Sequence, residues 1–186
     1  MYFSPTGGTK KVMDILTEEC QGTEQIDLSD AGYDFGKLSF GEDDICFIGV
    51  PAYGGRVPFI VSERIRKMKA DNTAAVLVAV YGNRAIDDTL LELKNEVKEC
   101  GFHPIAGVSA VAEHSIMRQY GTGRPDEKDT EELRQFSRKI RETLNARREG
   151  QELIVPGNMP YREYNGVPFK PKAGKKCIKC GKCAAV

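Results

Sequence analysis

The chain alternates short apolar runs, rich in β-branched residues, with segments whose apolar residues have helical spacing. The runs ICFIGV at 45–50 and AAVLVAVY at 74–81 predict strands, and the second is apolar enough for burial on both faces of a sheet. Between them, PFIVSERIRKMK at 58–69 predicts a helix with a proline in its first turn. This alternation predicts a parallel sheet with helices on both faces.

Further segments continue the alternation along the first 150 residues. The stub MYFS and residues 24–28 predict the first two strands, and IAGVSAVA at 105–112 predicts the fifth. Three more helices are expected, at residues 9–20, 86–100 and about 126–147. Elements in this order fit a doubly wound, five-stranded parallel sheet of order 2-1-3-4-5.

Composition and length set the expected domain organisation. A chain of 186 residues with 40% hydrophobic content can bury one core, so we expect a single domain over residues 1–150. Pro, Gly and Lys dominate the following stretch without periodicity, so residues 151–176 predict a linker or an ordered arm. Residues 177–186 then begin another module.

The formal net charge of zero hides an uneven distribution. From Gly157 to the end there are seven basic residues and one acidic residue, so this tail carries +6 and the rest of the chain carries −6. Nucleic-acid binding is not expected, because the body is acidic and the basic tail has few aromatic residues for stacking. No apolar run approaches the roughly 20 residues that cross a bilayer, and no signal-like region follows Met1, so we expect a cytoplasmic protein.

The first candidate site is the loop SPTGGT at 4–9, between the first predicted strand and the first helix. Ligands of open α/β sheets bind at the carboxyl ends of the strands, near the point where the strand order reverses. Three hydroxyls and a run of backbone N–H groups at a helix N-terminus suit a phosphate group. The loop lacks the lysine of a P-loop and the glycine spacing of a dinucleotide fingerprint.

Two further loops follow the third and fourth predicted strands. They read PAYGGRVP at 51–58 and YGNRAIDD at 81–88. Each joins an aromatic residue to glycine, which lets the backbone approach a flat ligand closely. Because the strands that they follow lie near the switch point, we expect all three loops to meet in one site.

Together these loops resemble those of the flavodoxins, whose phosphate loop usually reads T-x-T-G-x-T. Over its whole length the chain is similar to the flavodoxin half of the flavodoxin–ferredoxin fusion electron carriers of anaerobic bacteria, with AEHS at 112–115, GRPD at 123–126 and the terminal cysteines as further points of likeness. The resemblance implies a flavodoxin-like fold and FMN as the cofactor. It implies a phosphate site formed by Ser4, Thr6, Gly7, Gly8 and Thr9. It implies a flavin-ring site formed by Pro51, Ala52, Tyr53, Gly54, Gly55, Tyr81, Gly82, Asn83 and Arg84.

The sequence departs from the flavodoxin pattern in two ways. The chain contains no Trp, so Tyr53 or Tyr81 has to provide any aromatic stacking on the flavin. The first predicted strand is also shorter than usual, so we expect its N-terminal end to be missing.

Charged side chains near the third loop have two interpretations each. Arg84 is expected beside the flavin, with Asp87 or Asp88 as its alternative partner, and Asp87 is included in the cofactor site. Both aspartates fall in the first turn of a predicted helix, where the helix dipole favours acidic residues. His114 is expected either to contact the flavin or a substrate, or to bond to its own loop. Arg124 either docks a partner or braces its loop against the acidic start of the last helix.

The terminal cysteines predict an incomplete iron–sulfur motif. Cys177, Cys180 and Cys183 have the C-x2-C-x2-C spacing of the bacterial [4Fe–4S] run. A cluster needs four thiolates, so we expect the 4Fe-4S cluster only in a longer chain and not in this one. The other cysteines are expected to be reduced thiols packed in the body, at Cys20, Cys46 and Cys100.

Electron transfer is the leading interpretation, with FMN exchanging electrons with a redox partner protein or with the chain's own ferredoxin domain. No acid–base or nucleophile constellation is present in the sequence, which favours a carrier. One alternative is an FMN-dependent NAD(P)H:quinone or small-molecule reductase, with His114 and Arg84 shaping the substrate site. A second alternative is a zinc knuckle on a ligand-binding scaffold, because C-x2-C also suits zinc.

Overall fold

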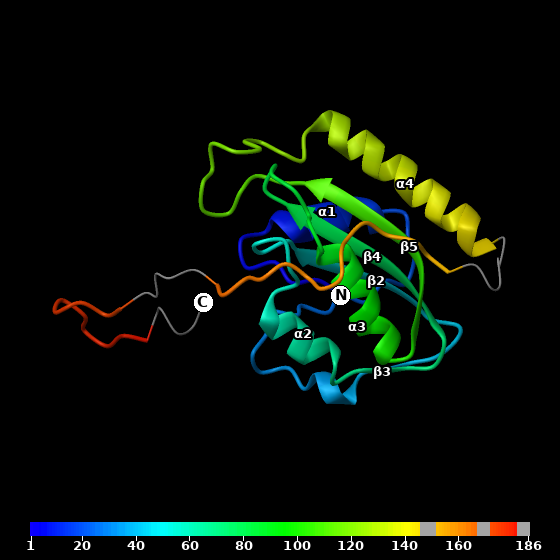
Figure 1. Ribbon diagram of the computed structural model, residues 1–186, viewed down its shortest axis with the longest axis horizontal. Helices are drawn as coiled ribbons and strands as arrows, with labels where there is room; N and C mark the ends of the chain where they lie inside the picture. Colours follow the sequence, from blue (N-terminus) through cyan, green and yellow to red (C-terminus); the bar gives the residue numbers. More distant parts are fainter. Residues whose placement is uncertain (146–151, 167–171, 182–186) are drawn as a thin grey trace.

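Three parallel strands form the centre of the computed structural model, which describes residues 1–145, 152–166 and 172–181 (Figure 1). Strands β2 (Ile45–Pro51), β4 (Thr73–Tyr81) and β5 (Phe102–Val111) pair in the order β2-β4-β5. The central strand β4 has a neighbour on each side and is buried along almost its whole length. Its nearly unbroken apolar sequence follows from this position.

The two N-terminal strands expected from the sequence are reduced to single bridges. Tyr2 bridges in parallel to Gly49 of β2 on one side and to Asp27 on the other. The Tyr2 N–H donates to the Ile26 carbonyl at 3.0 Å. The doubly wound α/β class is confirmed. The bridges place Tyr2 between Asp27 and β2, as the order 2-1-3 expects for the first three strands. The sheet is smaller than the predicted five full strands because the stub offers only one residue that pairs on both sides.

A second, two-stranded parallel sheet was not expected from the sequence. Strand β1 (Ser39–Phe40) pairs with β3 (Lys69–Ala70), and the short 3-10 helix η1 (Phe35–Lys37) precedes β1. Strands of two residues have too few positions to show an alternating pattern, so hydrophobic periodicity does not reveal them.

The helices are α1 (Gly8–Thr17), α2 (Phe59–Ile65), α3 (Thr89–Glu99) and α4 (Glu127–Asn145). Helix α3 begins three residues later than predicted because Asp87 has a φ of 43°, in the left-handed region that interrupts a helix. Helix α2 ends at Ile65, and the chain then turns into β3. The predicted end of the last helix, near residue 147, lies outside the described residues, as does the expected domain boundary at residue 150.

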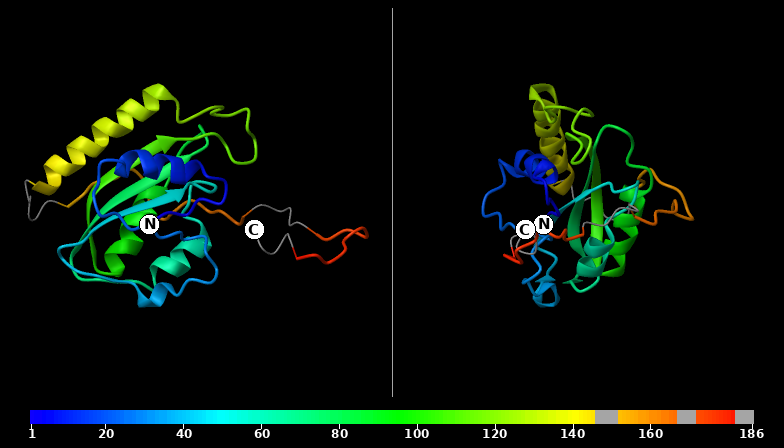
Figure 2. Two further views of the ribbon diagram at one scale, coloured as in Figure 1. Left: turned by 180° about the vertical axis from the view of Figure 1, so that it is seen from behind. Right: turned by 90° about the vertical axis from the view of Figure 1, so that its left-hand side faces the viewer.

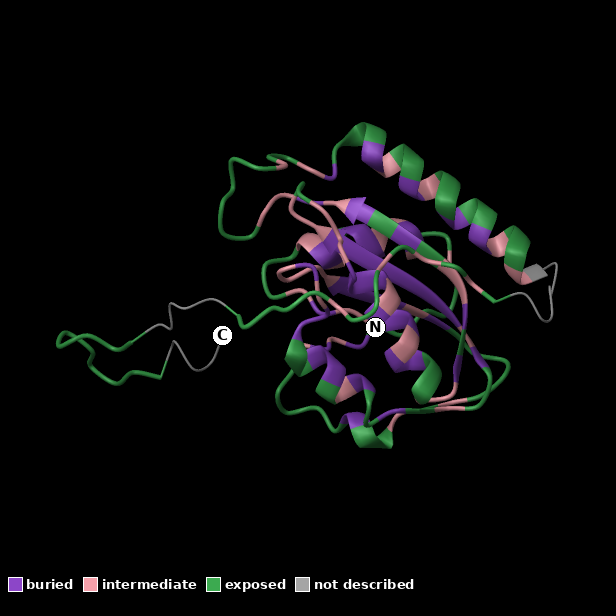
Figure 3. Ribbon diagram, in the orientation of Figure 1, coloured by how far each residue is buried: buried purple, intermediate pink, exposed green. Residues whose placement is uncertain are grey.

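Alternate residues of the central strands pack into two apolar cores, one on each face of the sheet. Helices lie on both sides of the sheet (Figure 2), and buried positions concentrate in the sheet and on one side of each helix (Figure 3). In β4, Leu77 faces the core shared with α2 and α3, whereas Val76 and Val78 face the core shared with α1 and α4. This is the period of two that a strand buried on both faces requires. The predicted arrangement of helices on both faces is confirmed.

Strand β5 begins at Phe102, three residues before the predicted start. Pro104 pairs with Ala75 and Ala106 pairs with Val76, so Ile105 is an extra residue in the ladder. Proline cannot donate to the ladder, and a bulge beside it accommodates the missing N–H group. The bulge interrupts the alternating pattern from which a strand start is predicted.

Residues 152–166, here called the C-terminal arm, contain no helix or strand and run across α3 toward the carboxyl ends of the strands (Figure 1). Residues 172–181 are all exposed and extend away from the body. None of the helices in the described part of the chain is long and apolar enough to span a bilayer.

Candidate functional site

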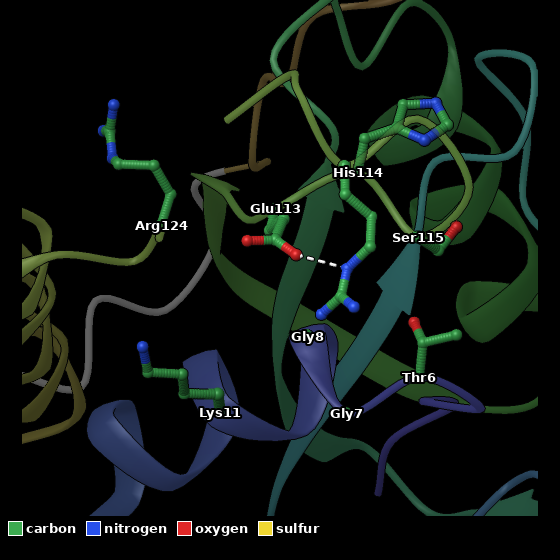
Figure 4. A pocket seen from close by; sticks show the side chains of 9 residues that line it. Thr6, Gly7, Gly8, Lys11, Glu113, His114, Ser115 and Arg124 are labelled. Atoms are coloured by element: carbon green, nitrogen blue, oxygen red, sulfur yellow. Dashed lines mark hydrogen bonds and ion pairs between the residues drawn. The ribbon is translucent and has the colours of Figure 1, made fainter. Parts of the chain in front are cut away.

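A cavity of about 540 Å³ lies at the carboxyl edge of the sheet, between the first loop and the loop after β5 (Figure 4). Its wall combines backbone from the start of α1 with polar and charged side chains. The lining residues are Thr6, Gly7, Gly8, Lys11, Glu113, His114, Ser115, Arg118 and Arg124. A larger cavity of about 620 Å³ at the opposite edge of the sheet contains none of the residues that the sequence assigned to a site.

The phosphate loop has the backbone geometry of an anion site. Gly7 is the N-cap of α1 with a φ of 85°, which only glycine adopts without strain, and having no side chain it makes no capping bond of its own. The Ser4 hydroxyl accepts the Lys10 N–H at 2.9 Å, and the Ser4 carbonyl accepts the Gly7 N–H at 3.2 Å. The loop is therefore closed on itself, with Thr6 exposed at the cavity and a helix N-terminus behind it.

Two predicted phosphate-site residues lie under or behind the loop rather than in the cavity wall. Thr9 is only 4% exposed and packs toward β2, where a Cβ added at Gly49 would lie 3.3 Å from the Thr9 methyl. A Cβ there would also lie 2.5 Å from the Met13 sulfur, so glycine at this position lets α1 approach the sheet. Ser4 and Thr9 shape the loop, whereas Thr6, Gly7 and Gly8 line the cavity.

Three cations surround the phosphate loop. Lys11 donates to the Pro125 carbonyl at 2.8 Å, and Arg118 donates to Glu113 at 2.7 Å, the dashed contact in Figure 4. The N–H of Gly123 and the Arg118 guanidinium both lower the pKa of Glu113, so it stays ionised. No sequence pattern pointed to Lys11 or Arg118. Lys11 stands one turn into a helix, and Arg118 stands in a loop without periodicity.

Arg124 pairs through two nitrogens with Asp129, in the first turn of α4, and lies 3.6 Å from Asp126. Of the two interpretations drawn from the sequence, the brace against the acidic helix start is the one observed. The side chain also borders the cavity, so its position links the loop after β5 to the phosphate loop.

Of the two roles considered for His114, the bond to its own loop is the one observed, and contact with a flavin or substrate stays a prediction. Its Nδ1 accepts N–H groups from Ile116 and Met117, each at 3.1 Å, so the ring is bonded to its own loop. In the neutral ring the proton then resides on Nε2, which is left as a donor. The ring also packs on Gly82, where an added Cβ would lie 2.6 Å from Cδ2. It therefore joins the cavity to the loop after β4.

The loops after β2 and β4 contact each other beside the cavity. Gly55 has a φ of 81°, and a Cβ there would overlap the Asp87 side chain. The ring of Tyr53 meets that of Phe3 edge-on, with centroids 6.4 Å apart. The structure brings the second and third loops together as expected, but neither Pro51–Gly55 nor Tyr81–Arg84 lines the 540 Å³ cavity.

Arg84 forms an ion pair with Asp87, the alternative partner considered from the sequence. Asp87 also pairs with Arg162 of the C-terminal arm at 2.6 Å. Arg84, the larger influence, and then Arg162 lower the pKa of Asp87. The positive charge of Arg84 is therefore balanced within its own loop.

Asp88 does not cap α3 as the helix dipole suggested. It makes no capping hydrogen bond and instead receives N–H groups from the arm. Its acidic character therefore contributes to arm docking, which only the folded structure reveals.

The two described cysteines of the terminal motif are exposed. The Lys179 N–H lies 3.4 Å from the Cys177 sulfur, and Cys180 is also free. In residues 1–145, 152–166 and 172–181 no group of three or more His, Cys, Asp or Glu side chains is placed to hold a metal ion. The third predicted ligand, Cys183, lies outside these residues. In the body, burial raises the pKa of the Cys46 thiol to about 11, consistent with an unreactive packed cysteine.

Several solved structures are similar to this fold. The oxidised flavodoxin 1 from Bacillus cereus has a TM-score of 0.53 and 16% identity, with 76% of this chain and 94% of that chain covered. The flavodoxin of Streptococcus pneumoniae TIGR4 has a TM-score of 0.51 and 17% identity, with the same coverage of 76% and 94%. Rubredoxin oxygen:oxidoreductase from Desulfovibrio gigas has a TM-score of 0.52 and 17% identity, with 80% and 36% covered.

A scan against protein-family models and a search of curated proteins each found no match. The structural alignments, together with the parallel β2-β4-β5 sheet between two helical layers, show that the chain has the flavodoxin-like doubly wound α/β fold.

Proposed function

We propose that this chain is an FMN-binding electron-transfer protein. The observation that carries the proposal is the cavity at the start of α1, where a glycine-rich helix N-terminus is surrounded by Lys11, Arg118 and Arg124. Backbone N–H groups at a helix terminus and nearby cations both favour a phosphate ligand. The flavodoxin-like fold supports FMN as the molecule that carries this phosphate.

The residues present fit a phosphate-linked flat ring. Thr6 and the N–H groups of the loop would hold the phosphate. His114, which lies between the first and third loops, would donate a hydrogen bond from Nε2 to the ligand. Tyr164, Asp87 and His114 pack directly on the glycines at 54, 55 and 82, so these side chains, rather than bare backbone, would face the flat ring. When bound, FMN supplies the redox chemistry by accepting and releasing electrons.

An iron–sulfur partner is part of this proposal. The C-terminal arm reaches Gly54 at the carboxyl edge before the chain continues to Cys177 and Cys180. The cysteine segment therefore leaves the body from the side on which the flavin is proposed to bind. A ferredoxin module, in a longer chain or in a separate protein, would exchange electrons with the flavin there.

Absorbance spectroscopy and steady-state kinetics test the proposal. The protein purified with added FMN should retain a flavin absorbance spectrum after desalting. The flavin-loaded protein should oxidise NADH or NADPH only slowly. Once its flavin has been reduced chemically and the excess reductant removed, it should pass electrons to an oxidised ferredoxin. Rapid turnover of a nicotinamide with a quinone would instead favour the reductase alternative, and loss of all flavin on desalting would contradict the proposal.

A further inference from the structure

The C-terminal arm makes a continuous series of contacts along α3. Near one end of the arm, Glu152 accepts from Lys94 at 3.0 Å and from Lys98 at 3.1 Å. A Cβ added at Gly157 would lie 2.4 Å from the Leu91 Cβ, which is too close for a real side chain, so the arm backbone lies directly on α3 there. Leu153 and Val155 also pack against the core on this face of the sheet. The arm is therefore docked through both ion pairs and apolar contacts.

Asp88 anchors the middle of the arm. It is only 2% exposed, and its two carboxylate oxygens accept the Asn158 N–H at 2.8 Å and the Arg162 N–H at 2.6 Å. Arg56 donates to the Arg162 carbonyl at 2.8 Å and lies 5.0 Å from the ring centroid of Tyr161. A buried carboxylate that receives backbone N–H groups holds a segment in one register, since each released donor would lose a charged partner.

This register places the ring of Tyr164 directly on Gly54. Gly54 has a φ of 61°, and a Cβ there would overlap the Tyr164 ring, so only glycine permits the contact. The ring is not enclosed, because Tyr164 remains 41% exposed. Burial, and secondly the nearby Tyr164, raises the pKa of Tyr53, which indicates that the two phenols are close. An aromatic face from the arm thus stands beside the aromatic residue of the second loop.

We propose that Tyr164 is a wall of the flavin-ring site and contacts the isoalloxazine, an inference that rests on the proposed function. Flat heteroaromatic rings bind well to aromatic side chains, and the chain has no Trp to serve on the second loop. The arm supplies this aromatic from a position more than 100 residues along the chain from Gly54. Asp88 is the positioning residue that keeps Tyr164 there.

Titration of the full chain with FMN, followed by flavin fluorescence, tests the inference. Tyr164→Ala should weaken FMN binding by about tenfold and leave the bound flavin more fluorescent, because a stacked phenol is lost. Tyr164→Phe keeps the ring face and should bind within about twofold of wild type. Phe136→Ala on α4 is a matched control, because Phe136 is a 39% exposed aromatic outside both the loops and the arm.

The outcomes separate the inference from the proposed function. If the wild-type protein binds FMN and Tyr164→Ala has the same affinity and flavin fluorescence, the role of Tyr164 is overturned and the proposed function is not. Tighter binding in Tyr164→Ala would also overturn it, because the arm would then exclude the ring. Absence of FMN binding by the wild-type protein would overturn the proposed function and this inference with it.

Discussion

The two halves of the candidate site are built in different ways. Around the phosphate loop, a helix N-terminus and three cations border an open cavity, and almost all of the loop geometry comes from residues 4–9. Around the loops after β2 and β4, the C-terminal arm covers the backbone and holds Asp87 and Asp88 in ion pairs and hydrogen bonds. The first half is local in sequence, whereas the second is completed by a distant segment.

This difference teaches which parts of a site a short motif can specify. An anion needs only N–H groups, a helix terminus and nearby charge, which a six-residue loop provides. A flat ring needs walls on its faces, and the wall contributed by Tyr164 depends on an arm that crosses the whole length of α3. Variants can therefore damage the second half while leaving the first intact.

The largest effect is expected from detaching the arm. Asp88→Ala removes the carboxylate that accepts two arm N–H groups, and we expect docking of the arm to weaken by roughly 3 kcal/mol. Hydrogen exchange of residues 152–164 should accelerate strongly while the strands stay protected. Asp71→Ala, at an exposed aspartate, is the control. Unchanged exchange in the arm would show that its apolar contacts suffice.

A smaller effect, confined to the other half, is expected from Thr6→Ala. Loss of a hydrogen bond to a charged phosphate should weaken FMN binding by about 2 kcal/mol without changing the hydrogen exchange of the arm. Thr23→Ala removes an exposed threonine that bonds only to its own turn and should have no effect. If Thr6→Ala binds FMN normally, the phosphate does not occupy this loop.

Acidification should loosen the arm. The N–H groups of Arg162 and Asn158 lower the pKa of Asp88 below its ordinary value. The ionised carboxyl stabilises the docked arm fully at pH values above its pKa in the unfolded chain, which is about 3.9. That contribution disappears as the pH falls through the lower pKa of the folded protein. The protection of the arm amides, taken relative to their intrinsic exchange rate at each pH, should therefore stay constant from pH 7 to about pH 4 and then fall. In Asp88→Asn this acid step should be smaller but not absent, because Asp87 and Glu152 also lose their ion pairs between the arm and the body.

The smallest effect is expected from Arg84→Ala. Because Asp87 balances this guanidinium and Arg84 is largely exposed, its removal should lower the flavin midpoint potential only slightly. Asp87→Ala, which leaves Arg84 unpaired, should raise the potential by more. Potentiometric titration of the two variants checks both signs, and a higher potential in Arg84→Ala would contradict this placement of charge.

The sequence predicted those features that periodicity and local motifs encode. The runs at 45–50 and 74–81 became β2 and β4, and the loop at 4–9 does line a cavity at the carboxyl edge. The two-residue strands and the start of β5 were missed because a short pairing and a bulge beside Pro104 leave no alternating pattern.

Features that depend on tertiary contacts were out of reach of the sequence. Asp88 was assigned to the helix dipole because the arm that occupies its carboxylate lies 70 residues further on. Tyr164 was read as part of an irregular, basic tail, and nothing in that composition indicates contact with Gly54. The adjacent glycines at 54 and 55 are visible in the sequence, but that they have positive φ values and which side chains pack on them are known only from the structure.

The most direct test of the account is a calorimetric titration of the protein with FMN and, separately, with riboflavin, which lacks the phosphate. The account predicts one FMN per chain and binding of riboflavin weaker by at least about tenfold, since the phosphate loop contributes only to FMN. Equal affinity for the two flavins would contradict the assignment of the first loop. Absence of saturable FMN binding would contradict the central claim that this edge of the sheet is a flavin site.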